Sequence, residues 1–195
     1  MLIADIYYNQ NKDTSMQTED QLTHICLKKG ASNSCIISAD QIKFEREMRA
    51  YCEVNQCGYF GKNYACPPLV GEIETLATDA RKYRSAIVYQ TTHHLTDSTD
   101  KETIKRCIQA HNSVANKIAK EVSKHYESHL DLRAGPCTVC PVCAIIDQQP
   151  CQYPEKKRAS LEAYGINVAA LAATCNMDYR SDKNTINFFG AFLLP

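Results

Sequence analysis

Hydrophobic residues recur along this chain with two different spacings. Spacings of three and four residues place apolar side chains on one face of a helix. The segments with this pattern are residues 18–30, 70–83, 100–127 and a stretch that begins at residue 161. Short runs rich in β-branched and aromatic residues predict strands instead. These runs lie at residues 34–38, 85–91, 130–134 and 186–194.

The predicted elements follow one another without a regular strand–helix–strand repeat. We therefore expect a single α+β (or α/β) domain with a small mixed sheet, several helices and cysteine-rich loops. We assign residues 19–195 to this domain. Residues 1–18, which are polar and without periodicity from Asn9 onward, are expected to form a flexible N-terminal segment.

The charge of the chain excludes some classes of partner. Lys and Arg together number 22, and Asp and Glu also number 22, so the formal net charge is zero. This balance gives no electrostatic drive toward nucleic acid or an anionic membrane. No apolar run approaches the roughly 20 residues of a membrane span. The first residues also lack the basic lead of a signal peptide, so we expect a cytoplasmic protein.

The cysteine content changes this picture, because the chain has 11 cysteines. Without an export signal, so many cysteines indicate a reducing compartment, where they serve metal or redox chemistry more often than disulfides. A disulfide scaffold is the alternative. The length of the chain, the missing signal and the odd number of cysteines all speak against it.

The C-terminal cysteine group is the most specific motif in the chain. It consists of Cys137, Cys140, Cys143 and Cys151, with the spacing C-x2-C-x2-C-x7-C. The nearest precedent is the iron–sulfur run C-x2-C-x2-C-x3-C-P. A zinc site more often uses two C-x2-C pairs separated by a dozen or more residues. The spacing favours a [4Fe-4S] cluster, and zinc is the alternative.

The N-terminal cysteine group consists of Cys52, Cys57 and Cys66, the last of which is followed by two prolines. All three lie in a Gly- and Asn-rich stretch that we expect to be a loop, where packing as small hydrophobic residues is less favoured. Three thiolates leave one coordination position of a metal to another ligand. Cys26, Cys35, a non-cysteine group or a substrate are candidates for it. We interpret this group as the ligands of a second metal or cluster, or as a contribution to one site shared with the C-terminal group.

Other residues carry weaker signals. Cys107 and Cys175 lie in predicted helical or alanine-rich segments, and we expect both in the core. No Gly-rich phosphate loop, nucleophile elbow or paired-carboxylate motif is present. The sequence therefore does not decide whether the protein is an enzyme.

The two cysteine groups and their surroundings resemble an uncharacterised prokaryotic family of predicted metal-binding proteins. The resemblance is carried by the motif C-x4-C-x8-CPP, by the motif GPC-x2-C-x2-CA-x6-C-x2-P, and by residues 160–168. It implies a cytoplasmic metalloprotein, typical of anaerobes, that uses the seven motif cysteines as ligands. It implies no established reaction. Gln152 and Tyr64 differ from the Arg and Trp that are usual at these positions.

Three hypotheses follow. The first is a small iron–sulfur protein with one or two [4Fe-4S] clusters that transfers electrons to a redox partner protein. The second is a structural zinc protein that organises loops for protein contacts. The third is a thiol-based metal carrier or sensor. Neither nucleic acid nor a membrane is expected as a partner, and the sequence leaves the oligomeric state open.

Overall fold

The computed structural model describes residues 19–95, 100–180, 182 and 184–195. The expected N-terminal segment, residues 1–18, lies outside them. Within the described part, a five-stranded mixed sheet has the strand order β1-β2-β5-β3-β4. Neighbouring strands are antiparallel, except that β3 and β4 are parallel. The strands are β1 (Asn33–Ser38), β2 (Ser85–His94), β3 (Leu130–Arg133), β4 (Ala159–Ser160) and β5 (Thr185–Leu194).

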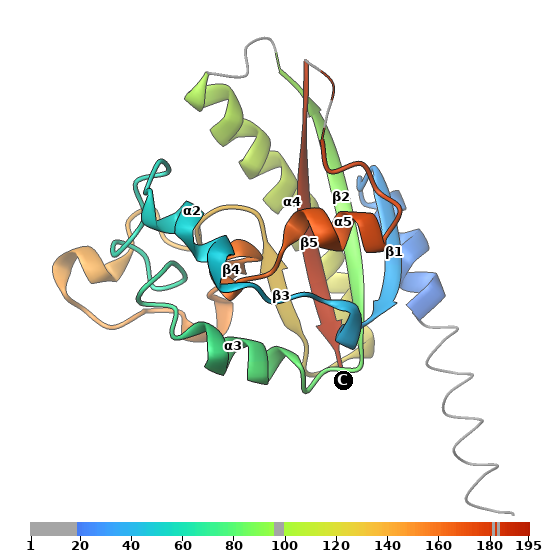
Figure 1. Ribbon diagram of the computed structural model, residues 1–195, viewed down its shortest axis with the longest axis horizontal. Coiled ribbons are helices and arrows are strands. Elements are labelled where there is room, and N and C mark those ends of the chain that lie inside the picture. The colour runs from blue at the N-terminus through green and yellow to red at the C-terminus, as the bar shows by residue number, and fades with distance from the viewer. Residues whose placement is uncertain (1–18, 96–99, 181, 183) are drawn as a thin grey trace, which may run out of the picture.

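The helices cover both faces of this sheet, which confirms the expected single α+β domain (Figure 1). One helix spans residues 19–28. The labelled helices are α2 (Ala50–Glu53), α3 (Ile73–Ala80), α4 (Lys101–His125) and α5 (Val168–Thr174). Among the described residues, none of the helices is both long and apolar enough to cross a membrane.

Alternate side chains of the central strands point to opposite faces of the sheet and build two cores. On one face, Ile87 and Phe192 pack with Leu22 of the first helix and Ile118 of α4. On the other face, apolar residues of the sheet pack against α5 and the segments around it, and Leu171 is part of this core. The apolar stripe predicted for residues 100–127 is thus the face by which α4 covers the sheet.

The predicted helix that begins at residue 161 is divided in the structure. A 3-10 turn at Glu162–Tyr164 ends at Gly165, whose φ of 73° is left-handed and suits glycine. The helix resumes as α5 after Asn167, whose side-chain oxygen accepts from the backbone N–H of Ala170. The two cysteine groups lie near this turn, on the β4 side of the molecule and away from β1 (Figure 1).

Candidate metal centres

The loop that carries the C-terminal cysteine group begins just after β3. Gly135 has a φ of 75°, and a Cβ atom there would lie 3.0 Å from Cγ2 of Ile108 on α4. A glycine therefore lets the chain turn closely beneath α4. After Cys143 the loop forms a 3-10 turn at Ala144–Asp147, which ends at Gln148 in the left-handed conformation. These turns bring the later part of the loop back toward the beginning of the loop.

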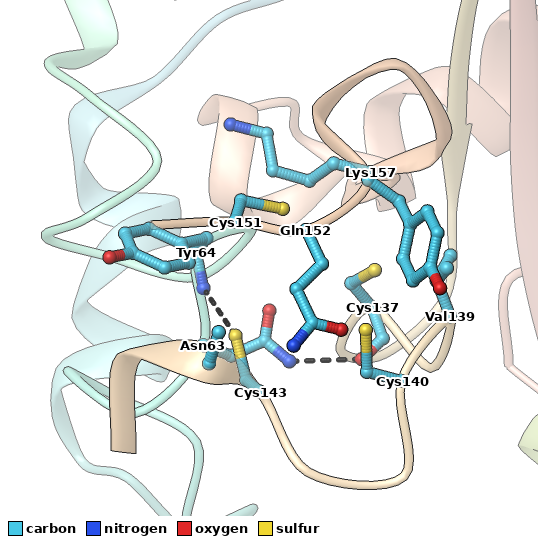
Figure 2. Close-up of a pocket in the computed structure, with 11 residues that line it drawn as sticks. Asn63, Tyr64, Cys137, Val139, Cys140, Cys143, Cys151, Gln152 and Lys157 are labelled. Atoms are coloured by element: carbon cyan, nitrogen blue, oxygen red, sulfur yellow. Dashed lines mark hydrogen bonds between the residues drawn. The ribbon is translucent and has the colours of Figure 1, made fainter. Parts of the chain in front are cut away.

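The loop brings the whole C-terminal group together around one hollow. Cys137, Cys140, Cys143 and Cys151 all line it. Figure 2 shows the four sulfur atoms around this space, with the side chain of Gln152 reaching across it. All four cysteines are partly exposed. Burial and the neighbouring thiols of the group raise the pKa of Cys140.

Asn63 and Tyr64, near the end of the segment that carries the N-terminal cysteine group, close one side of this hollow. The backbone N–H of Tyr64 donates to Sγ of Cys143 at 3.4 Å, and Nδ2 of Asn63 donates to the carbonyl oxygen of Cys137 at 2.9 Å (Figure 2). The Tyr64 hydroxyl donates to the carbonyl oxygen of Gln149 at 2.8 Å. Hydrogen bonds to cysteine sulfurs are one means by which proteins tune iron–sulfur clusters.

Asn63 joins the two segments, so its replacement by alanine is expected to destabilise the fold. Its side chain is only 3% exposed, and its oxygen also accepts from the backbone N–H of Ala65 at 3.0 Å. Asn63→Ala leaves the Cys137 carbonyl and this N–H without their partner, which should cost about 1–3 kcal/mol. Urea unfolding measures the loss. The neighbouring exposed Lys62 provides the control Lys62→Ala, and equal stabilities of the two variants would contradict the role of Asn63.

The N-terminal group lines a second hollow. Cys52, Cys57 and Cys66 lie in its wall, together with Glu162 and the start of the other cysteine loop at Gly135. Burial, followed by Glu162 and Cys57, raises the pKa of Cys52 to about 11. Burial and four neighbouring cysteines raise the pKa of Cys66 to about 12. Thiolates gathered here repel one another, so a bound cation would relieve that repulsion.

The segment before Cys52 is anchored by a buried arginine. Arg49 is 8% exposed, and its Nε and Nη2 atoms donate to the carbonyl oxygen of Ala163 at 3.0 and 2.9 Å. Nη2 also donates to the carbonyl oxygen of Gly71 at 2.6 Å. Burial lowers the pKa of Arg49, whereas Glu72 and Cys52 raise it. The guanidinium thus holds the turn after Glu162 against the segment that carries Cys52.

The seven predicted ligands divide into two groups in the structure. Among the residues that the structure describes, none lines both hollows. The hollows are nevertheless adjacent, because Cys137 and Cys143 of the C-terminal group are among the charges that raise the pKa of Cys66. Across the described ranges, no three His, Cys, Asp or Glu side chains are gathered closely enough to hold one metal ion.

The remaining cysteines lie elsewhere. Neither Cys26 nor Cys35 lines either hollow. Cys26 belongs to the first helix and is buried in the core that this helix covers, and burial raises the pKa of its thiol to about 11. Cys35 packs in the opposite core, which also contains Cys175. Cys107 and Cys175 are both buried, as the sequence predicted. All 11 cysteines are free thiols, so none forms part of a disulfide scaffold.

Comparison with known proteins provides an independent observation. The model of a family described as "Predicted metal-binding protein (DUF2284)" matches residues 35–194. The chain belongs to this family. The matched residues include both cysteine groups, Arg49, Asn63 and Glu162. The family description supports metal binding and leaves the kind of metal unstated. Searches of curated proteins and of solved structures gave no match.

The sequence alone did not single out three residues that build these sites. Asn63 and Glu162 are ordinary positions inside longer motifs, and Arg49 is a single positive charge near Cys52. Each acts across a long stretch of chain: Arg49 bonds a residue 114 positions away, and Asn63 one 74 positions away. These residues are distinguished by the burial of a charge or an amide, and burial cannot be recognised from the sequence of a single loop.

Proposed function

We propose that the protein is an iron–sulfur electron carrier in which the C-terminal cysteine group holds a [4Fe-4S] cluster. The observation that carries this proposal is that all four cysteines of one short loop line one hollow. Four thiolates are the ligand set of such clusters. The bound cluster supplies one-electron oxidation and reduction. The N-terminal cysteine group is proposed to bind a second metal or cluster in its own hollow.

The donor set would suit zinc as well as iron, since both metals bind thiolates. Two features favour the cluster. The first three cysteines follow one another at two-residue spacing, as in iron–sulfur loops. The backbone N–H of Tyr64 is also directed at Sγ of Cys143, from a segment far away in sequence. Such a hydrogen bond stabilises the reduced, more negative state of a thiolate-bound cluster.

The surface around the two groups supports docking of a protein partner. Most of the large hydrophobic side chains exposed in the described part of the chain belong to these two segments. They are Tyr51, Val54, Tyr59, Leu69, Val139, Val142, Ile146 and Tyr153. Exposed apolar side chains that cluster in this way commonly mark an interaction surface. We propose a redox protein of an anaerobic cytoplasm as the partner, because the cluster would lie just beneath this surface.

Reduction of anaerobically purified protein tests the proposal. The protein as isolated should be brown, because sulfur-to-iron charge transfer absorbs broadly in the visible range. Addition of dithionite should bleach this absorbance and produce an electron paramagnetic resonance signal, and an oxidised electron acceptor should reverse both changes. A colourless protein that contains zinc would overturn the proposal in favour of a structural zinc protein, which shows metal-dependent folding without redox activity.

A further inference from the structure

The hollow of the N-terminal cysteine group contains one further metal-binding side chain. Glu162 lines this hollow together with Cys52, Cys57 and Cys66. It belongs to the 3-10 turn just after β4, about 100 residues from these cysteines in sequence. Three thiols and one carboxyl therefore share a single cavity. Three cysteines alone leave a coordination position of a metal unfilled by the protein.

Glu162 lines this hollow and also a cavity bordered by Tyr179 and Arg180. Its side chain is half-buried, and it forms no salt bridge with any cation in the part of the chain that the structure describes. A carboxylate that leaves water needs a compensating cation or strong hydrogen bonds. A metal bound by the neighbouring thiolates supplies that cation.

Several hydrogen bonds hold Glu162 in place against the cysteine segment. Arg49 donates twice to the carbonyl oxygen of Ala163, which is the next residue in the turn. The backbone N–H of Glu45 donates to the carbonyl oxygen of Gly165 at 2.6 Å. Oγ of Ser160 accepts from the backbone N–H of Ala163 at 3.1 Å. The turn is therefore fixed before a metal binds, as an efficient ligand position requires.

We infer that the Glu162 carboxylate is the fourth protein ligand of the centre formed by Cys52, Cys57 and Cys66. This inference rests on the proposed function, because it takes that centre to bind iron. The iron is either a single ion or one corner of a cluster, and inorganic sulfide distinguishes the two. In both cases a carboxylate oxygen completes a set of three thiolate sulfurs, and Arg49 lies beside the resulting anionic site as a counter-charge.

The test uses the full chain with the substitution Cys140→Ser. This substitution disables the centre of the C-terminal group, so that the centre of the N-terminal group is observed alone. The protein is reconstituted anaerobically with ferrous iron and sulfide. Bound iron is then measured during competition with an iron chelator, and the paramagnetic resonance spectrum is recorded. Glu162→Gln keeps the size of the side chain and removes the charge, whereas Glu162→Cys supplies a thiolate. Glu53→Gln removes an exposed carboxylate next to Cys52 and is the matched control.

Glu162→Gln should lower iron affinity at least about tenfold and should alter the spectrum. Glu162→Cys should restore affinity with a different spectrum, because sulfur replaces oxygen, and Glu53→Gln should leave both unchanged. Circular dichroism verifies that each variant is folded. Unchanged affinity and spectrum in Glu162→Gln would overturn the inference and leave the centre itself intact. Absence of bound iron from the Cys140→Ser parent would overturn the N-terminal centre, and Glu162 as its ligand with it.

Discussion

Replacement of Cys140 by serine should remove the cluster of the C-terminal group, together with its share of iron, sulfide and visible absorbance. Cys140 lines the hollow with the three other cysteines of its loop. A serine hydroxyl is a much poorer ligand for iron than a thiolate, so the loop would keep three suitable donors. Metal binding also contributes to folding, so unfolding should begin at lower urea concentration. Metal analysis and visible spectroscopy of anaerobic protein measure the loss.

Cys107 provides the matched control for this variant. It is a buried cysteine on α4 that lines neither hollow. Cys107→Ala should therefore retain all iron and the full visible spectrum, with at most a modest loss of stability from the smaller side chain. If Cys140→Ser retains the same iron and sulfide as the native chain, the C-terminal group is not a cluster site.

Arg49→Met should be the most destabilising single change near the N-terminal group. The guanidinium forms three hydrogen bonds to the carbonyl oxygens of Ala163 and Gly71, and its residue is 8% exposed. Methionine fills similar space and leaves both carbonyls without a donor. Because hydrogen bonds to charged groups contribute about 1.5–3 kcal/mol each, and removal of a buried charge recovers part of that, we expect a loss of about 3 kcal/mol. Urea unfolding measures this loss.

Arg46→Met is the control for this change, since Arg46 lies in the same 3-10 turn, Arg46–Arg49, but at the surface. Its side chain is 74% exposed and forms an ion pair with Glu74, which is also exposed. Such surface pairs contribute about 0–1 kcal/mol. If both arginine variants lose the same small amount of stability, the Arg49 hydrogen bonds do not hold the two segments together.

The sequence predicted the parts of the fold that depend on local pattern. The apolar stripe between residues 100 and 127 matches α4, which covers one face of the sheet. The strand expected at 85–91 is the first part of β2. These elements are visible in sequence because burial of one face imposes a regular spacing on neighbouring residues.

The candidate sites could be predicted only in part, for a physical reason. Close spacing was enough to indicate that Cys137, Cys140 and Cys143 act together, because a short loop cannot separate them widely. Spacing could not show whether the N-terminal group shares their hollow, and the structure places it in a second one. Spacing also gave no sign that Glu162 lines that second hollow. These relations depend on long-range hydrogen bonds such as those of Arg49.

The central claim is that the clustered thiols bind iron and inorganic sulfide, and metal analysis of the protein tests it most directly. The chain should be purified without exposure to oxygen, and iron, zinc and acid-labile sulfide should be measured per chain. We expect iron and sulfide in roughly equal amounts, with about four of each for the C-terminal group. Stoichiometric zinc without sulfide would contradict the claim.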